Sequence, residues 1–594
     1  MRMLMRGLVC AALVAGVVSV APPAVGGEPR PRMPQICRNE INASERMHAD
    51  VSALASSGVL SLDGRTIRVH GDDAQWRQYQ EGDQTYVARF HSMQWLVLAQ
   101  QEGYPAVDLF LERDAALPDP GSNASDKALK STGWTEGAVR LRMGTVSCLY
   151  EWTGDERLIP VAERLVLASA DPYRYRGLPL KKAHNHGTLA NIILAETAKV
   201  FGRDDWWELA IRRFSNDASA VFSDCGMSFE QSAPYQLLNL EIWERSLRLL
   251  EEEGNRTATV VREALERASL ATLQLSRPDG VLEAIGDGND KTIDPALVNV
   301  DTATAGTRLW CPQRGWAANR SSWDDSTTHF VLRFGPKVAL HGHDDHGAIT
   351  WYSQGVPVFS DRGLFDKTRG TRYKWARSKA AHSTFEPVGI NSAREMRATD
   401  RSTDRVGAYS LAWDEGTFAS TRDITVPLDA VMIPAVTVAP PADDTTVVDD
   451  STVIDDTVPV VPMTSLHVDD IGTSRFDQQW MQNWQLALGW TVLPRSNASE
   501  PVAYHEESGL YLYGACYSGL FMAPTAKTVE AYPKWRTVVP ATAFVCGGLG
   551  REVKIDTLWV VTPLKGTLQW DRSADEYTVV PPPLPPLPPI PSPS

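Results

Sequence analysis

The stretch Val338–Asp361, VALHGHDDHGAITWYSQGVPVFSD, concentrates polar side chains just before an apolar sequence typical of β-strands. Six consecutive residues of this stretch, 341–346, contain three histidines and two aspartates. If this part is extended, alternate side chains point to the same side, so His341, His343 and Asp345 would share one face. Such a face is expected to be solvated, to bind a metal or to take part in catalysis, because unpaired buried polar groups are costly. A solvated hairpin rich in histidine is the simpler alternative.

Short β-like runs continue on both sides of this stretch, and Gly and Pro residues separate them. The runs are Thr328–Phe334, Ala348–Ser353, Val356–Ser360, Val406–Trp413, Gln485–Val492, Gly509–Tyr513, Thr537–Val545 and Val553–Thr562. Such a series predicts an antiparallel sandwich or a stack of antiparallel sheets for the second half of the chain.

The first half has a different periodicity, because apolar residues recur at helical spacing from about Tyr79 to Leu273. The successive apolar runs lie around Trp95, Val146, Leu165, Ile192, Phe214, Ile242 and Leu265. Ser232 suits a helix N-cap and Pro234 suits a first helical turn, which would hold Tyr235 near a helix start. Short breaks separate the runs, so this half is expected to be a helical bundle or a helical toroid.

The N-terminal residues have the pattern of an export signal. Arg2 and Arg6 precede the apolar run Leu8–Val20, and the small residues of a cleavage site follow within residues 1–26. An uncleaved anchor is the alternative, but no later run approaches the roughly 20 apolar residues of a membrane span. We therefore expect a secreted or periplasmic protein without stable membrane insertion.

Six cysteines follow the expected export signal, an even number that suits disulfides in an oxidising compartment. They are Cys37, Cys148, Cys225, Cys311, Cys516 and Cys546. The sequence does not choose among the possible pairings. Buried free thiols are the alternative.

The formal net charge of -15 argues against broad nucleic-acid binding, which requires a basic face. One segment is nevertheless basic. Between Asp361 and His382 lie Arg362, Lys367, Arg369, Arg372, Lys374, Arg377 and Lys379. This concentration of positive charge suggests an anionic ligand, and a solvated strand edge protected by Lys and Arg is the alternative. The segment Pro427–Met463 has many aspartates and no Lys or Arg, and we expect it to be an unfolded insertion.

Several short motifs occur in a fixed order between about Gly133 and Thr384. They are Asn185-His186 before a helix, Glu230-Gln231-Ser232-x-x-Tyr235, Asp279-Gly280 with Ile285-Gly286-Asp287, His341-x-His343-x-Asp345, Asp361-x-Gly363, and Arg377 followed by Ala381-His382-Ser383-Thr384. Together they resemble the heparinase II/III-like polysaccharide lyases and the similar alginate lyases. Ser383 is a departure, because relatives usually carry Asn after the histidine.

The resemblance implies an α+β multidomain fold, with an N-terminal (α/α) toroid followed by an antiparallel β-sandwich or stacked-sheet domain. We expect the toroid at residues 27–290 and the β-sheet domain at residues 291–575. The acidic insertion would occupy residues 427–463 of the second domain. A Pro-rich tail would follow at residues 576–594.

The resemblance also implies an enzyme that cleaves an anionic, uronic-acid-containing polysaccharide by β-elimination. Asn185, aided by His186, would neutralise the sugar carboxylate, and Tyr235 would protonate the leaving oxygen. Either Tyr235 or His186 would remove the C5 proton. His341 would contact the substrate or lower the pKa of Tyr235. The expected substrate-binding residues are Glu230, Arg372, Tyr373 and Arg377.

His343, Asp361 and His382 match a metal site in some relatives. Two imidazoles, a carboxylate and a water suit tetrahedral Zn²⁺, whose expected role is structural. A hydrogen-bonded cluster without metal is the alternative. No organic cofactor is expected.

Two other functions stay open on the sequence alone. A glycoside hydrolase would need a pair of carboxylates, for which Glu230, Asp344 and Asp345 are candidates. A non-catalytic polysaccharide-binding protein is the other, although the joint presence of Asn185, His186, Tyr235 and His341 argues against a decayed site.

Overall fold

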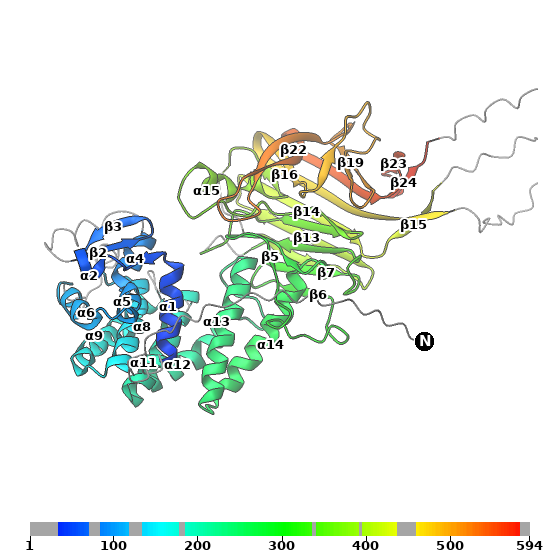
Figure 1. Cartoon of the computed structure of the whole chain (residues 1–594). Helices are drawn as coiled ribbons and strands as arrows, with labels where there is room; N and C mark the ends of the chain where they lie inside the picture. Colours follow the sequence, from blue (N-terminus) through cyan, green and yellow to red (C-terminus); the bar gives the residue numbers. More distant parts are fainter. Residues whose placement is uncertain are drawn as a thin grey trace, which may run out of the picture.

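The structure is a computed structural model that describes residues 34–69, 84–117, 133–176, 184–335, 340–390, 395–435 and 459–582. Within these ranges the chain forms a helical domain followed by layers of antiparallel sheet, as Figure 1 shows. This confirms the predicted fold class of a helical toroid followed by a stacked-sheet domain. The expected export signal lies outside the described residues.

The helices of the first domain pack around a common apolar core. Their bounds are α1 Gln35–Arg46, α2 Leu54–Ser57, α4 Gln84–Ser92, α5 Trp95–Gln101, α6 Ala106–Ala115, α8 Glu136–Thr153, η1 Glu156–Leu158, α9 Ile159–Ala170, α10 Pro172–Arg176, α11 Asn185–Phe201, α12 Asp204–Val221, α13 Ala233–Glu252 and α14 Thr257–Leu275. None of the helices in the described ranges has the length and apolar character to cross a membrane. A small antiparallel sheet of β1 Ala49–Asp50, β2 Val59–Leu62 and β3 Arg65–Arg68 lies in a part of the chain without a clear sequence pattern.

Local sequence chemistry sets the start of α13. The Ser232 side chain accepts a hydrogen bond from the backbone N–H of Tyr235, and Pro234 lies in the first turn. Both predictions are confirmed, and they fix Tyr235 at the N-terminal end of a long helix. Gly154 ends α8 in the left-handed conformation (φ 68°), as expected for the break after Thr153.

The sheet next to the helices has five strands in the described part of the chain. In spatial order they are β10 Val356–Phe359, β9 Ala348–Ser353, β8 His329–Arg333, β7 Trp316–Arg320 and β6 Arg308–Cys311. All residues of β7, β8 and β9 are buried, because one face of this sheet contributes to the helical core and the other packs on the next sheet. Gln274 at the end of α14 donates hydrogen bonds to the carbonyls of Gly306 and Arg308. This middle layer therefore joins the two domains.

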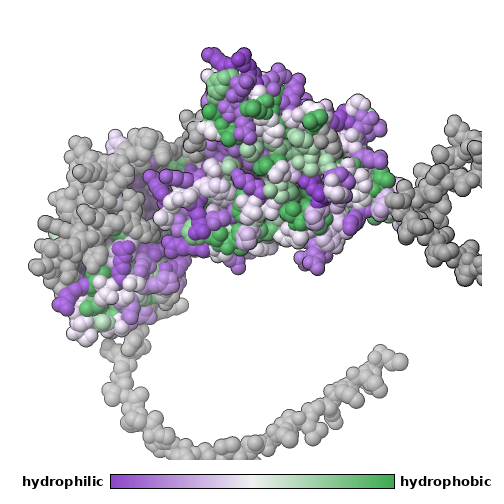
Figure 2. Space-filling view, turned by 90° about the horizontal axis from the view of Figure 1, so that it is seen from above, coloured by the Kyte–Doolittle hydropathy of each residue, from purple (hydrophilic) through white to green (hydrophobic). Residues whose placement is uncertain are grey.

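The outer sheet contains the remaining long strands. Its main path is β12 Arg397–Asp400, β13 Val406–Asp414, β14 Phe418–Pro427, β16 Val460–Gln485, β22 Val539–Thr562, β19 Leu510–Tyr517, β18 Ala503–His505 and β17 Trp490–Val492, with β11 Phe385–Pro387, β15 Val431–Pro434, β20 Phe521–Met522 and β21 Thr525–Ala531 paired alongside. Every second residue of β13 from Gly407 to Trp413 is buried. Figure 2 shows hydrophilic and hydrophobic residues interleaved on the outer surface of these layers.

Several predicted boundaries in this sheet are wrong. Thr537–Val545 and Val553–Thr562 belong to one strand, β22, and Gln485 ends β16 rather than beginning a strand. Gly and polar residues in the middle of β22 resemble turn signals, but pairing with β16 over nearly its whole length keeps them extended. Four short elements lie between the helical domain and the outer sheet along the chain. They are the paired strands β4 Val281–Leu282 and β5 Lys291–Thr292 and the helical turns α15 Thr371–Ala376 and η2 Lys379–Ala381.

The two segments expected to lack structure are partly folded. Val431–Pro434 pairs with Val460–Met463 as antiparallel strands, so both ends of the proposed insertion 427–463 are ordered by β-branched residues. Residues 436–458 lie outside the described ranges. Glu576–Val580 forms β24 with β23 Thr567–Asp571, so the expected tail from residue 576 begins as a strand. Residues 583–594 are also outside the described ranges.

All six cysteines of the described chain are paired. Cys37–Cys148 joins α1 to α8, and Cys516–Cys546 joins β19 to β22, with Cα–Cα distances of 4.7 and 6.3 Å. Cys225–Cys311, with Cα atoms 5.7 Å apart, joins the loop before α13 to β6. These separations fit disulfide geometry. The last bridge supports the contact between the helical and the β layers.

Candidate active site

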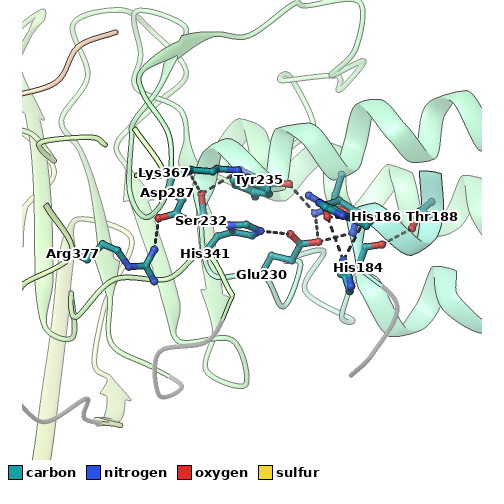
Figure 3. Close-up of polar contacts among 12 residues, drawn as sticks. His184, His186, Thr188, Glu230, Ser232, Tyr235, Asp287, His341, Lys367 and Arg377 are labelled. Carbon is teal, nitrogen blue, oxygen red and sulfur yellow. Dashed lines mark hydrogen bonds and ion pairs between the residues drawn. The ribbon is translucent and has the colours of Figure 1, made fainter. Parts of the chain in front are cut away.

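The start of α13 and the loop 340–347 bring Tyr235 and His341 together. Their rings are stacked, with centroids 3.5 Å apart and planes inclined by 10°. Lys367, from the loop after β10, donates a hydrogen bond to the Tyr235 hydroxyl, and its Nζ lies 5.1 Å from the ring centroid (Figure 3). Burial raises the pKa of Tyr235, and the Lys367 ammonium opposes that rise. The phenol is thus placed between an imidazole and a cation.

Glu230 connects this pair to the start of α11. Its Oε1 accepts hydrogen bonds from the Asn185 backbone N–H at 2.9 Å and from Asn239 Nδ2 at 3.1 Å. Its Oε2 lies 3.5 Å from His341 Nε2. Glu230 has no exposed surface, so it positions Asn185 and His341 and does not present a free carboxylate.

His341 is held from its other side by Asp287. The ring Nδ1 of His341 lies 3.0 Å from Asp287 Oδ2, and His343 Nε2 lies 3.1 Å from Asp287 Oδ1. Arg377 also donates to Asp287 and to the carbonyl of Gly342. Burial alone would raise the pKa of Asp287, but its partners His341, His343 and Arg377 lower it well below the usual range. Asp287 therefore joins the stacked site to the histidine cluster behind it.

The segment 341–347 is a loop and not the extended strand considered from the sequence, since β9 begins only at Ala348. Positive φ angles at Leu340 (48°) and Gly347 (81°) turn the backbone at both ends. His341 and His343 still converge on one carboxylate. Asp345 does not join them, because it is fully buried and lies 3.7 Å from Arg333.

His186 lies on the opposite side of Glu230, in the first turn of α11. Its Nδ1 is 2.9 Å from Glu136 Oε2, and its side chain is 55% exposed. Asn185, the first residue of the helix, uses its Oδ1 to accept the His186 backbone N–H at 2.7 Å. Burial raises the pKa of Glu136, but Arg140 and His186 lower that pKa by more than burial raises it, so the net shift is downward. The Glu136 carboxylate can therefore accept a hydrogen bond from the Nδ1–H of His186.

Figure 3 shows His184 and His186 at the start of α11 in one cluster with Glu230, His341 and Tyr235, and Asp287 and Arg377 lie beside it. The structure thus brings together all four residues expected to be catalytic: Tyr235 stacks on His341, and Glu230 links His341 to the helix start that carries Asn185 and His186. Of the expected substrate-binding residues, Glu230 belongs to this cluster but is buried, and Arg377 contacts the cluster through Asp287. Its guanidinium also lies 5.3 Å from the ring centroid of Tyr373.

The predicted metal ligands His343, Asp361 and His382 converge, with ligand atoms within 4.8 Å of one another. His382 Nδ1 lies 2.7 Å from Asp361 Oδ2. The buried His343 Nδ1 and His382 Nε2 have no hydrogen-bond partner among the described residues. Two orphaned imidazole nitrogens beside a buried carboxylate fit a zinc site. The Ser383 hydroxyl, at the position that departs from the relatives, accepts the Gln485 backbone N–H at 2.9 Å.

The basic segment does not form one anion-binding surface. Arg362 is buried and donates to Gln485 and to the carbonyls of Leu486 and Thr542. Arg372 forms an exposed ion pair with Glu530 at 2.9 Å. Only Lys367 and Arg377 reach the site. The periodicity of the sequence could not separate these roles, because the segment is a loop with only the short helical turns α15 and η2 among its described residues.

A large cavity lies on the other side of this loop, between α15 and β21. Its volume is about 940 Å³, and aromatic residues contribute much of its wall. Phe365, Tyr373, Trp375 and Tyr532 are the aromatic members, with Arg372 and Glu530 among the charged ones. Arg372 and Tyr373 therefore line this cavity rather than the stacked cluster.

Three residues of the site were not singled out from the sequence. Lys367 was one of seven similar cations, and Asp287 belonged to a motif without an assigned role. Glu136 gives no local signal at all, since its contact with His186 spans 50 residues. The sequence signal next to Asp287 is the glycine at 286. In the structure Gly286 has φ 83°, and a Cβ there would lie 2.8 Å from the Gln231 carbonyl, so the chain around Asp287 packs closely against the start of α13.

Comparison with known proteins supports the same architecture. Residues 304–425 match the sequence model of the family described as Heparinase II/III-like, C-terminal. No curated protein is significantly similar to the sequence. A solved heparinase III is 12% identical, with a TM-score of 0.59 over 85% of this chain and 80% of its own. Heparan sulfate lyase HepC from Pedobacter heparinus is 12% identical, with a TM-score of 0.56 over 92% and 86%.

A second heparinase III, the BT4657 gene product, is 13% identical, with a TM-score of 0.56 over 84% of this chain and 80% of its own. At these identities the likeness concerns the fold. The described chain therefore has the toroid and β-sheet architecture of heparinase III, and its residues 304–425 are similar to the heparinase II/III-like C-terminal family.

Proposed function

We propose that this protein is a polysaccharide lyase that cleaves a uronic-acid-containing polysaccharide by β-elimination. The observation that carries the proposal is the Tyr235 hydroxyl, which meets Lys367 while its ring stacks on His341. A phenol so placed suits proton transfer at a sugar ring. The likeness to heparinase III in fold, and the family match over residues 304–425, support the same reaction class.

In this reaction the C5–H bond of the uronate breaks first, and its electron pair is stabilised as an enolate of the neighbouring carboxylate. Asn185 and His186, at the positive end of α11, would neutralise that carboxylate. The Asn185 amide oxygen is already engaged with the His186 N–H, so Nδ2 is the donor that the amide offers. One donor aimed at developing charge contributes about 3–4 kcal/mol to such a step.

The C4–O bond then breaks, C4=C5 becomes a double bond, and Tyr235 protonates the departing oxygen. When the C5 proton and the leaving oxygen are on the same face, Tyr235 can also accept the C5 proton. When they are on opposite faces, His186 would be the base. Its Nδ1 faces Glu136, which favours the tautomer that leaves Nε2 free to accept a proton. The tautomer argument makes Glu136 a positioning residue.

The metal and the cellular location are part of the proposal. We propose that His343, Asp361 and His382 bind zinc, which would hold the loop of His343 against the strands behind it. Asn185, His186 and Tyr235, and not the metal, would act on the substrate. We also propose that the protein is exported, because of the N-terminal sequence pattern.

The hydrolase alternative has less support, because its candidate carboxylates are engaged. Glu230 and Asp345 have no exposed surface. Asp344 lies 3.6 Å from Lys379 and from His346. A glycoside hydrolase would need a free carboxyl group on each side of the scissile bond.

A panel of uronate polysaccharides tests the proposal: heparan sulfate, alginate, hyaluronan and bacterial exopolysaccharides. A lyase creates a conjugated C4=C5 double bond that absorbs ultraviolet light, whereas a hydrolase produces new reducing ends without it. We expect absorbance to rise in step with the loss of polymer length on at least one substrate. Shortened chains without absorbance would reject elimination in favour of hydrolysis.

A further inference from the structure

We propose that Lys367 is a catalytic residue that sets the protonation of Tyr235, and this inference rests on the proposed elimination. Lys367 was expected only as one member of a basic segment. Its contact with the Tyr235 hydroxyl makes it different from every other cation of that segment in the described chain. The contact joins the β-domain loop to the first turn of α13.

The surroundings of Tyr235 explain why a cation is needed there. Among the described residues, the charged or titratable groups that face it are Lys367, His341, Asp287 and Glu230. The two carboxylates and the burial of the phenol disfavour a phenolate. Lys367 provides positive charge at the hydroxyl itself, and it is exposed, so its ammonium remains hydrated. Without Lys367, Tyr235 would keep its own proton and could not act as the base that accepts the C5 proton.

The proton and electron balance of the step is simple. Tyr235 Oη, as a phenolate hydrogen-bonded to the Lys367 ammonium, takes the proton from C5 and becomes a phenol. The C5–H electron pair forms the C4=C5 double bond as the C4–O bond breaks. The phenol then gives the same proton to the departing oxygen, which restores the phenolate. Lys367 keeps all its protons and donates the hydrogen bond throughout.

Lys367→Met and Lys367→Arg test this assignment by the dependence of kcat on pH. If Tyr235 is the base, Lys367→Met should shift the acidic limb of the profile upward by about one unit or more. If Tyr235 serves only as the acid, the basic limb should shift upward instead. Either shift, reversed by Lys367→Arg, supports the assignment. An unmoved profile with only a raised KM would mean that Lys367 merely binds substrate, and would overturn it.

Lys374→Met is the matched control, because Lys374 is an exposed cation of the same loop on α15. Its pH profile should coincide with that of the wild type. A shift as large as that of Lys367→Met would assign the effect to general charge loss and overturn the specific role.

A spectroscopic titration separates this inference from the proposed reaction. The ultraviolet phenolate absorbance of the wild type minus that of Tyr235→Phe isolates one tyrosine. We expect Lys367→Met to raise the midpoint of that difference titration and Lys367→Arg to restore it. If the midpoint moves while no polysaccharide yields an unsaturated product, the pairing stands and the lyase proposal fails. If the midpoint stays fixed while the wild type makes unsaturated product, the lyase proposal stands and the role of Lys367 fails.

Discussion

The ring of Tyr235 lies flat on the imidazole of His341, with centroids 3.5 Å apart. Tyr235 belongs to the first turn of α13, and His341 belongs to the loop that leads into β9. The stack therefore spans the helical and the β layers. Because the site around the proposed acid Tyr235 needs residues from both layers, a change that separates the two layers should reduce activity before it unfolds either layer.

Glu136→Gln should slow the proposed reaction with little effect on the fold. The amide is close to isosteric, but its NH₂ can face the His186 ring and favour the wrong tautomer. We expect kcat to fall at least about ten-fold, within the range of general acid–base contributions. The measurement is the initial rate of ultraviolet absorbance. Glu156→Gln, in the exposed turn η1, is the control.

If Glu136→Gln retains the full rate while His186→Ala does not, His186 acts without Glu136 and the tautomer argument is wrong. If both Glu136→Gln and His186→Ala retain the wild-type rate, His186 takes no part in the reaction and Tyr235 acts alone.

The histidine–aspartate cluster predicts bound zinc. Metal analysis of the purified protein should find about one equivalent, since structural zinc sites hold a single ion. His382→Gln should lose the metal and lower the midpoint of thermal unfolding, and chelation should lower that of the wild type to a similar value. Metal-free wild type whose midpoint is insensitive to chelator would contradict the site and favour the hydrogen-bonded cluster.

A pH effect on stability is expected where His467 of β16 meets the β23–β24 hairpin. Burial lowers the pKa of His467, but Asp556 and Asp575 raise it more, so the net shift is upward. A raised folded-state pKa contributes stability that is fully present below the unfolded value of about 6.5 and is lost as pH rises through the folded value. Asp575 lies 3.4 Å from His467 and belongs to the turn between β23 and β24.

Thermal unfolding of the wild type and of His467→Gln, each at an acidic and an alkaline pH, checks this prediction. The wild type should exceed the variant in stability by more at the acidic pH. A constant difference between the two proteins across that range would show that His467 does not link protonation to folding.

Short-range chemistry explains what the sequence could predict. The start of α13 depends on Ser232 and Pro234, which act within three residues of each other, and the periodic helices need only their own apolar faces. Asn185-His186 and His343, Asp361 and His382 occur in recognisable short motifs. The helix start and the periodic helices are readable because cause and effect are neighbours along the chain, whereas the roles of Asn185-His186 and of His343, Asp361 and His382 were expected only through the resemblance to the lyase family.

The missed features depend on distant partners. The contact between Lys367 and Tyr235 spans 132 residues, and nothing near Lys367 distinguishes it from Lys374. The strand β22 keeps Gly547 and Gly548 extended because β16 pairs with them. The alternating polar residues of the loop 341–347 are compatible with a strand, but backbone turns at Leu340 and Gly347 decide its shape.

The most direct measurement is the rate of unsaturated product formation by Tyr235→Phe on the best substrate of the panel. Phenylalanine keeps the ring stacked on His341 and removes only the hydroxyl that Lys367 contacts. The account predicts a loss of about 1,000-fold or more in kcat with an unchanged thermal midpoint. A variant that forms the double bond at the wild-type rate would contradict the account, because elimination would then proceed without the phenol at its centre.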